Sequence, residues 1–383
     1  MSAAPLVAGA AWGGASAADA ESGGSAHLPR ELGLGGTLDR FVAKLAERDE
    51  FSGTLLVKRR GRTALQRAYG MADKAREIPN TPDTIFILGS ITKLFTAVAI
   101  AQLAQQGTVA YDANVGRYLD GLPAKIADTV TIHQLLTHTS GLGDYHSKEY
   151  FEAAAEWDSA RDVWEGTWEF VRRSELLFTP GSRQTYSNTG YVLLGAIVAE
   201  LSKEKSYYEY VRSHVFEAAR TKVTDFYTRP EWRANPRIAL PYEKRPSGER
   251  VEVVDRHGWI GLPPGGAFAD ASDLAAFADA LMGHRLLRPE YTHLTVTPKL
   301  PIPIGDGPGE SPDVLGLPFA TYAPLAELID RQWVLGHSGG SPGVSANLTW
   351  FPDSGWVAVI LSNYGERATA PINRLVRRLV TDR

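Results

Sequence analysis

FILGSITKLFTA, residues 86–97, combines an apolar run with a hydroxyl group and an amine. The run is interrupted at Gly89, and the pattern beyond it predicts a helix continuing to about Gln106. Ser90 lies at the start of this helix and Lys93 follows three residues later. Both side chains are therefore expected on one face, about 5–6 Å apart at Cβ. The helix dipole favours negative charge on the hydroxyl, and burial lowers the pKa of an amine, which can then accept a proton. The pair is a candidate nucleophile with its own base; the alternative is a helix-capping serine beside a surface lysine.

The composition is that of a globular protein large enough for one large or two ordinary domains. The chain has 383 residues, of which 44% are hydrophobic and 22% are charged. Its net charge of −4 indicates no extended basic surface, so we expect no nucleic-acid partner. The sequence contains no cysteine, which excludes disulfides, thiolate catalysis and cysteine-based metal sites.

Residues 1–36 differ from the rest of the chain. They are rich in Ala, Gly and Ser, and Ala15-Ser16-Ala17 resembles a small-residue cleavage site. The first basic residue is Arg30, so the positively charged start of a signal peptide is missing. We expect a leader or flexible tail, a possible remnant of a signal peptide, and therefore a periplasmic or secreted protein. If the segment is only a tail, a cytoplasmic location is the alternative.

One apolar window has the length of a membrane span. It runs from Ile85 to Ala104, but Lys93 lies near its middle and Gly89 interrupts it. A central lysine costs about 2.5–3.5 kcal/mol on insertion scales. We therefore predict a buried helix and no integral membrane segment.

Hydrophobic periodicity places strands at both ends of the chain and helices in the middle. The segment 143–178 is acidic, aromatic and irregular, and its Trp157, Trp164 and Trp168 are candidates for a pocket wall. Ser272 is the expected N-cap of its helix, and residues 300–318 are expected to form a loop. The predicted helices are 37–48, 131–136, 189–201, 273–281 and 370–380, and the predicted strands are 53–58, 63–69, 332–335, 345–351 and 356–361.

A turn precedes the long apolar helix that begins near residue 189. Tyr186 and Asn188 alternate on its extended end, so both can face one cleft. A tyrosine beside a lysine ammonium can relay a proton, although an ordinary half-buried tyrosine fits the local sequence equally well.

Two other patterns are set aside. Gly336-His337-Ser338-Gly339-Gly340 matches the nucleophile elbow G-x-S-x-G, but strands rather than a helix are expected after it and no histidine follows His337. His133, His138 and His146 lack the spacing of helical metal ligands, so we predict structural histidines and no metal site. Neither a metal nor an organic cofactor is expected.

Three motifs follow one another along the chain: Ser90-x-x-Lys93, Tyr186-Ser187-Asn188 and His337-Ser338-Gly339. Together they resemble the serine β-lactamase and penicillin-binding-protein superfamily, in particular its class C branch with D-Ala-D-Ala carboxypeptidases, D-aminopeptidases and β-lactamase-like esterases. Supporting phrases are residues 135–142 (LLTHTSGL), Pro180-Gly181, Gly265-Gly266 with Asp273, and Gly340.

The resemblance implies an α+β fold, within the broad α/β class. An antiparallel sheet flanked by helices, built from about 37–84 and 318–380, would pack against a mostly helical subdomain of about 85–317. Residues 37–380 would then form one catalytic unit, with the active site between the two parts.

The resemblance also implies roles for the motif residues. Ser90 would form an acyl-enzyme, with Lys93 and Tyr186 sharing acid and base duty. Asn188 would hold the substrate amide or orient Lys93, and the N–H groups of Ser90 and Gly340 would form the oxyanion hole. The resemblance also makes His337 a candidate catalytic residue and Ser338, Gly339 and Gly340 candidate substrate-binding residues.

Two departures narrow the expected activity. His337-Ser338-Gly339 replaces the usual K-T-G, and an imidazole is a weaker carboxylate anchor than an ammonium. No E-x-x-L-N segment is placed like the class A deacylating glutamate.

We therefore expect a serine hydrolase of carboxylesterase type acting on a small-molecule ester. A D-amino-acid peptidase is the first alternative and a β-lactamase the second; a non-catalytic relative that binds peptidoglycan or a partner is more remote. The sequence leaves the oligomeric state open.

Overall fold

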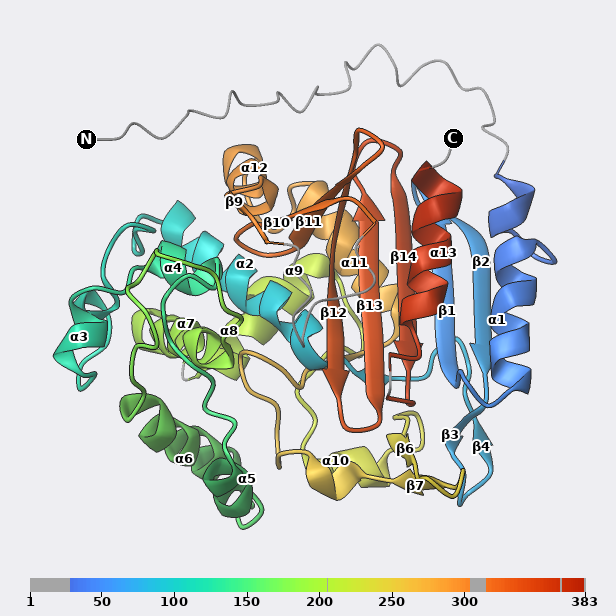
Figure 1. Ribbon diagram of the computed structural model, residues 1–383, viewed down its shortest axis with the longest axis horizontal. Helices are drawn as coiled ribbons and strands as arrows, with labels where there is room; N and C mark the ends of the chain where they lie inside the picture. The colour runs from blue at the N-terminus through green and yellow to red at the C-terminus, as the bar shows by residue number, and fades with distance from the viewer. Residues whose placement is uncertain (1–27, 205, 304–314, 366, 382–383) are drawn as a thin grey trace.

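The computed structural model describes residues 28–204, 206–303, 315–365 and 367–381. An antiparallel sheet of eight strands runs through the molecule in the order β2-β1-β14-β13-β12-β11-β10-β9 (Figure 1). The first two strands, β1 and β2, therefore lie in one sheet with the last six, β9 to β14, although most of the chain separates the two groups. The strands of this sheet are β1 (Gly53–Arg59), β2 (Arg62–Tyr69), β9 (Leu300–Pro301), β10 (Leu317–Ala320), β11 (Leu325–Ile329), β12 (Gln332–Ser341), β13 (Val344–Phe351) and β14 (Trp356–Ser362).

Both faces of the sheet are covered, and alternation along the strands explains why. Leu55 and Val57 of β1 join one apolar cluster, whereas Leu56 joins the other, since successive side chains of a strand point to opposite faces. One cluster lies under α1 (Thr37–Glu47) and α13 (Ala370–Thr381). The other lies around α2 (Thr92–Gln105), α7 (Asn188–Leu201) and α11 (Ala271–Met282). The predicted α+β class is confirmed.

Most of the remaining helices lie beside the far edge of the sheet, whereas α11 packs on its face against β14 and β1 (Figure 1). The central one is α2, which is buried along almost its whole length and packs against α7. These helices are α2 (Thr92–Gln105), α3 (Ala124–Ala127), α4 (Ile132–Leu136), α5 (Lys148–Ala154), α6 (Ala160–Arg172), α7 (Asn188–Leu201), α8 (Tyr207–Val211), α9 (Glu217–Ala219), α10 (Arg229–Ala234), α11 (Ala271–Met282) and α12 (Pro289–Val296).

Short elements complete the chain. The small two-stranded pairs are β3 (Met71–Asp73) with β4 (Ile78–Pro79), β5 (Phe86–Ile87) with β8 (Phe268–Ala269), and β6 (Tyr242–Lys244) with β7 (Arg250–Glu252). The 3₁₀ turns are η2 (Arg30–Leu32), η3 (Gly89–Ile91), η4 (Val115–Arg117) and η6 (Val254–Arg256), and η5 (Arg212–Phe216) is a π-helical turn. The proposed division into two subdomains within 37–380 stays a prediction.

Two local predictions were wrong. The segment 143–178 is not irregular, because α5 and α6 form there behind the N-caps Ser147 and Ser159, whose side chains accept backbone N–H groups. Asp270, not Ser272, caps α11, because its carboxylate accepts the N–H of Asp273. The predicted start of this helix, residue 273, lies two residues after the observed start at Ala271.

The predicted leader extends too far at its C-terminal end. Arg30–Leu32 form η2, and Leu32 is fully buried against the cluster beneath α1. The leader prediction otherwise concerns residues 1–27, which lie outside the described residues. The same holds for residues 304–314 of the predicted loop 300–318, whose two ends carry β9 and the start of β10.

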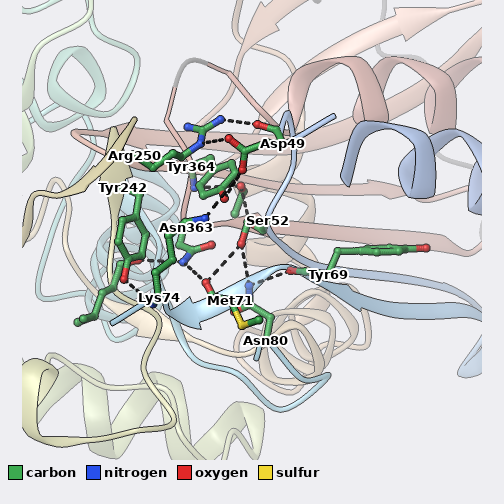
Figure 2. Close-up of polar contacts among 12 residues, drawn as sticks. Asp49, Ser52, Tyr69, Met71, Lys74, Asn80, Tyr242, Arg250, Asn363 and Tyr364 are labelled. Carbon is green, nitrogen blue, oxygen red and sulfur yellow. Dashed lines mark hydrogen bonds and ion pairs between the residues drawn. The ribbon is translucent and has the colours of Figure 1, made fainter. Parts of the chain in front are cut away.

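A cluster of polar contacts connects segments that are far apart in the sequence (Figure 2). Tyr364 donates its hydroxyl to Asp49 at 2.6 Å, and Arg250 binds the other oxygen of that carboxylate at 2.8 Å. Asn363 donates to the carbonyl of Met71 at 2.9 Å. Segments from the start, middle and end of the chain are thereby held at one end of the sheet.

The apolar window 85–104 is interior rather than membrane-spanning. It forms β5, η3 and most of α2, and α2 is surrounded by other helices. In the part of the chain that the structure describes, no helix has both the length and the apolarity needed to cross a membrane.

Candidate active site

Ser90 lies on the tight turn η3, pressed against the end of β12. Gly89 has φ of +52°, a left-handed conformation that favours glycine. A Cβ on Gly89 would lie 2.7 Å from the N atom of Gly340, and a Cβ on Gly339 would lie 1.8 Å from the carbonyl oxygen of Leu88. The sheet and the helical part therefore touch backbone to backbone where Ser90 emerges.

We expect Gly339→Ala to disrupt this contact. The added methyl group cannot fit 1.8 Å from a carbonyl oxygen, so β12 must move away from η3. Ester hydrolysis should fall by about 10²-fold, since an ångström-scale misplacement has that effect, and the melting temperature should also fall. Gly33→Ala is the control, because φ there is −100° and a Cβ would approach no atom closer than 3.7 Å. Wild-type activity of Gly339→Ala would contradict the close contact.

Lys93 is fully buried below Ser90. Its Nζ lies 3.3 Å from Ser90 Oγ, 2.7 Å from Asn188 Oδ1 and 2.7 Å from the carbonyl oxygen of Pro264. Burial lowers the pKa of the amine to about 7, although the negative charge of Asp144 partly opposes this. Near neutral pH, much of Lys93 is therefore an uncharged amine.

Tyr186 stands over the same group. Lys93 Nζ lies 4.7 Å from the centre of its ring, and His138 stacks on the ring at 4.5 Å. Tyr186 is 46% exposed, but the partial burial of its phenol raises the pKa of that group, and a hydrogen bond with Ser90 opposes part of the rise. The phenol is thus protonated at neutral pH and adjoins the Ser90 hydroxyl.

Asn188, the first residue of α7, connects Lys93 with a carboxylate that the sequence analysis did not identify. Its Nδ2 donates to Asp144 Oδ2 at 2.6 Å. Asp144 also contacts His146, at 3.0 Å, and these contacts lower its pKa to about 2 despite burial. Asp144 is 44 residues away in sequence, and only tertiary folding brings it to Asn188.

The three residues of the predicted third motif lie on β12. His337 is buried, donates Nδ1–H to the Ser338 carbonyl at 2.6 Å, and has its pKa lowered to about 4 by burial and by Lys93. Gly339 packs on Leu88, whereas Ser338 is exposed. The strand continues through a turn into β13, so the nucleophile-elbow alternative is wrong for Ser338.

The three histidines considered as metal ligands have separate surroundings. His133 Nδ1 lies 2.8 Å from the hydroxyl of Tyr322. His138 accepts the N–H of Ser187 at 3.2 Å beneath Tyr186, and His146 pairs with Asp144. Each has a structural partner of its own.

A cavity of about 720 Å³ opens in front of Ser90. Of the predicted residues, Ser90, Tyr186, Asn188 and Gly340 line it. One wall is aromatic and comes mainly from α5 and the segments flanking it, and the opposite wall comes from segments near α10, η6 and β8. The aromatic wall contains Tyr145, Tyr150, Phe151 and Trp157, and the opposite wall contains Tyr227, Trp232, His257 and Phe268.

The predicted pocket wall was correct for only one of its tryptophans. Trp157 lines the cavity and is accommodated by Gly166, where a Cβ would lie 2.2 Å from the indole. Trp164 instead stacks against Tyr207, and Trp168 packs against the apolar core. The opposite wall was missed because residues 202–260 show no periodic pattern.

With fold and site geometry established, comparison with known proteins identifies the family. The Beta-lactamase family matches residues 38–382, and the chain belongs to this family. It is 34% identical over 195 residues to penicillin-binding protein 4* of Bacillus subtilis (strain 168), covering 50% of this chain and 42% of that protein. It is 42% identical over 107 residues to esterase EstB of Burkholderia gladioli, covering 27% of each. The matched regions thus span less than half of either relative's length.

A solved structure extends the likeness to nearly the whole fold. The penicillin binding protein from Bacillus halodurans superposes with a TM-score of 0.76 at 28% identity, covering 88% of this chain and 98% of that one. The resemblance to the serine β-lactamase and penicillin-binding-protein superfamily is therefore confirmed.

Proposed function

We propose that the protein is a serine hydrolase that acts through an acyl-enzyme, with Ser90 as nucleophile and Lys93 as base. The hydrogen bonds of the Lys93 amine carry this proposal. Asn188 Oδ1 and the Pro264 carbonyl can only accept, so both require an N–H from Lys93. A neutral amine has two N–H groups, and its lone pair is then left for the hydroxyl proton of Ser90, 3.3 Å away.

The proposed acylation step moves one proton and exchanges one bond. Ser90 Oγ bonds to the substrate carbonyl carbon while its proton passes to Lys93, giving an ammonium and a tetrahedral oxyanion. Collapse breaks the bond to the leaving group, which takes the proton from Lys93 through the Tyr186 hydroxyl. Water then attacks the acyl carbon and gives a proton to Lys93. The second tetrahedral intermediate collapses, the bond to Ser90 Oγ breaks, and Ser90 takes the proton back from Lys93.

Backbone N–H groups of Ser90 and Gly340 are the proposed oxyanion hole. Pairing between β11 and β12 ends at Gly336, so the following residues of β12 have one open edge, and this edge adjoins η3. Gly340 pairs with Ser345 one step before the turn at 342–343. Because hydrogen-bonded and non-bonded pairs alternate in an antiparallel ladder, the N–H of Gly340 is directed to the open edge. This supports a second donor close to that of Ser90.

An uncharged ester is the proposed substrate. The low pKa of His337 leaves it neutral at pH 7, so it offers no positive charge to a substrate carboxylate. The aromatic wall offers apolar surface for an acyl group. A D-amino-acid peptide is the alternative substrate, and a β-lactam is a further one. Comparison of kcat/KM for a short-chain p-nitrophenyl ester, a D-Ala-terminated peptide and a chromogenic cephalosporin tests the choice: the ester should be preferred, and preference for the cephalosporin would contradict it.

We expect Trp157→Ala to change acyl-chain preference. Removing the indole takes apolar surface from the cavity wall, and each methylene that loses its contact forfeits about 0.8 kcal/mol, or about fourfold in kcat/KM. The ratio of kcat/KM for p-nitrophenyl hexanoate to that for the acetate should fall by about tenfold, the loss expected when one or two methylenes of the longer chain lose their contact with the indole. Leu294→Ala, which alters an exposed leucine of α12, is the control. An unchanged ratio would place the acyl group against the other wall.

A further inference from the structure

We propose that Asp144 is a positioning residue, which fixes the Asn188 amide so that its oxygen faces Lys93 and the amine lone pair faces Ser90. The inference rests on the proposed function and assigns a role to a residue outside the three motifs. Asp144 touches neither Ser90 nor Lys93 through a hydrogen bond in this structure. Its action passes through Asn188.

The hydrogen bonds form a chain with a defined direction. Lys93 Nζ donates to Asn188 Oδ1 at 2.7 Å, and Asn188 Nδ2 donates to Asp144 Oδ2 at 2.6 Å. A carboxylate only accepts, so the NH₂ end of the amide must be the end that faces Asp144. The oxygen end is then directed to Lys93 by chemistry.

The alternative orientation shows why this matters. If the Asn188 amide turned over, its Nδ2 donors would face the Lys93 amine and would be satisfied by the lone pair. The lone pair would then no longer be available to the Ser90 hydroxyl, and acylation would lose its base. Asp144→Asn would be compatible with the turned amide, because the new side-chain NH₂ group can donate a hydrogen bond to Asn188 Oδ1.

The loop that carries Asp144 is fixed against the start of α7. Ser187 donates its hydroxyl to the carbonyl of Gly143 at 2.8 Å and accepts the N–H of Gly190. His146 contacts the second carboxylate oxygen of Asp144 at 3.0 Å and stacks on Phe151. Asp144 is therefore held in place from both sides.

Charge gives this role a second signature. The titratable groups around Lys93 are His138, His337, Tyr186, Tyr191 and Asp144. Burial lowers the pKa values of the two histidines and raises those of the two tyrosines, so all four are uncharged near pH 7. Asp144 is ionised there and raises the pKa of Lys93, against the larger lowering by burial.

The test compares pH profiles of kcat/KM for p-nitrophenyl acetate in Asp144→Asn, Asp144→Glu and Glu149→Gln. Glu149 is an exposed carboxylate on the adjacent α5, so Glu149→Gln removes one charge without touching Asn188. Asp144→Asn should lower the high-pH plateau, mainly through kcat, by about tenfold or more. Its rising limb should also move to lower pH, because the remaining burial lowers the pKa of Lys93 further. Asp144→Glu should recover both properties in part, and Glu149→Gln should stay within about twofold of wild type.

Asn188→Ala provides the second arm of a double-mutant cycle. Because Asp144 is proposed to act through Asn188, Asp144→Asn should have little further effect on the plateau in that background. Equal behaviour of Asp144→Asn and Glu149→Gln would overturn the inference while wild-type turnover kept the proposed function intact. A loss with no shift of the limb and no recovery by Asp144→Glu would make Asp144 merely structural and would also overturn it. Wild-type protein without Ser90-dependent turnover would instead defeat the proposed function itself.

Discussion

Ser90→Ala is expected to lower kcat for ester hydrolysis by about 10⁴–10⁶-fold, the range typical of losing a nucleophile. The variant retains the cavity and the backbone donors but has no oxygen with which to form the acyl-enzyme. Because Ser90 is only half-buried and its hydroxyl makes few contacts, the fold should be preserved. Steady-state kinetics with p-nitrophenyl acetate, together with a thermal melt, measures both properties.

Ser272→Ala is the matched control for this experiment. Ser272 is exposed in the first turn of α11 and lies outside the cavity, so its replacement removes the same atom from another helix start. It should have wild-type kcat. If Ser90→Ala kept turnover on every ester and peptide tried, Ser90 would not be the nucleophile.

Lys93 is expected to set the acidic limb of the pH profile. Its pKa is about 7, and the protonated ammonium has no lone pair, so only the neutral amine can accept the Ser90 proton. Activity should therefore rise with pH through about 7 and level off above it. An exposed lysine, with its pKa near 10, would instead place the rise several pH units higher.

Lys93→Ala is expected to lower kcat by about 10²–10⁴-fold and to remove the limb near pH 7. Lys125→Ala is its control, because Lys125 is exposed on α3 and makes no contact with the cavity. A limb that persisted near pH 7 in Lys93→Ala would assign that titration to another group. The cavity left by the buried side chain should also lower the melting temperature, which a parallel melt would separate from the catalytic effect.

Local patterns predicted a substantial part of the fold. α1, α7 and α13 followed from apolar periodicity, and the hairpin of β1 and β2 from two alternating runs around a short turn. The juxtaposition of Ser90 and Lys93 was also local, since a spacing of three on a helix fixes it. The place of Tyr186 in the same site came from the family resemblance, because nothing within its own segment relates it to Ser90.

Local sequence patterns could not predict contacts between segments that are distant in the chain. Asp144 gave no signal, because its meaning depends on Asn188, which lies 44 residues later in a different element. The cavity wall with Trp232 and His257 belongs to a stretch without periodicity, where burial depends on distant residues such as Phe268 and Pro342. α5 and α6 were missed for another reason: their serine caps were present in the sequence, but the aromatic content obscured the helical pattern.

Covalent labelling of the nucleophile, in which Ser90 Oγ would displace fluoride from a fluorophosphonate and form a phosphonyl ester, tests the proposed mechanism most directly. Wild-type protein would be treated with a fluorophosphonate, and the labelled residue identified by mass spectrometry of the digested protein, with Ser90→Ala and Ser272→Ala in parallel. We predict one adduct per chain on Ser90 in the wild type and in Ser272→Ala, and none in Ser90→Ala. A label on Ser338 or any other residue, or equal labelling of Ser90→Ala, would contradict the mechanism.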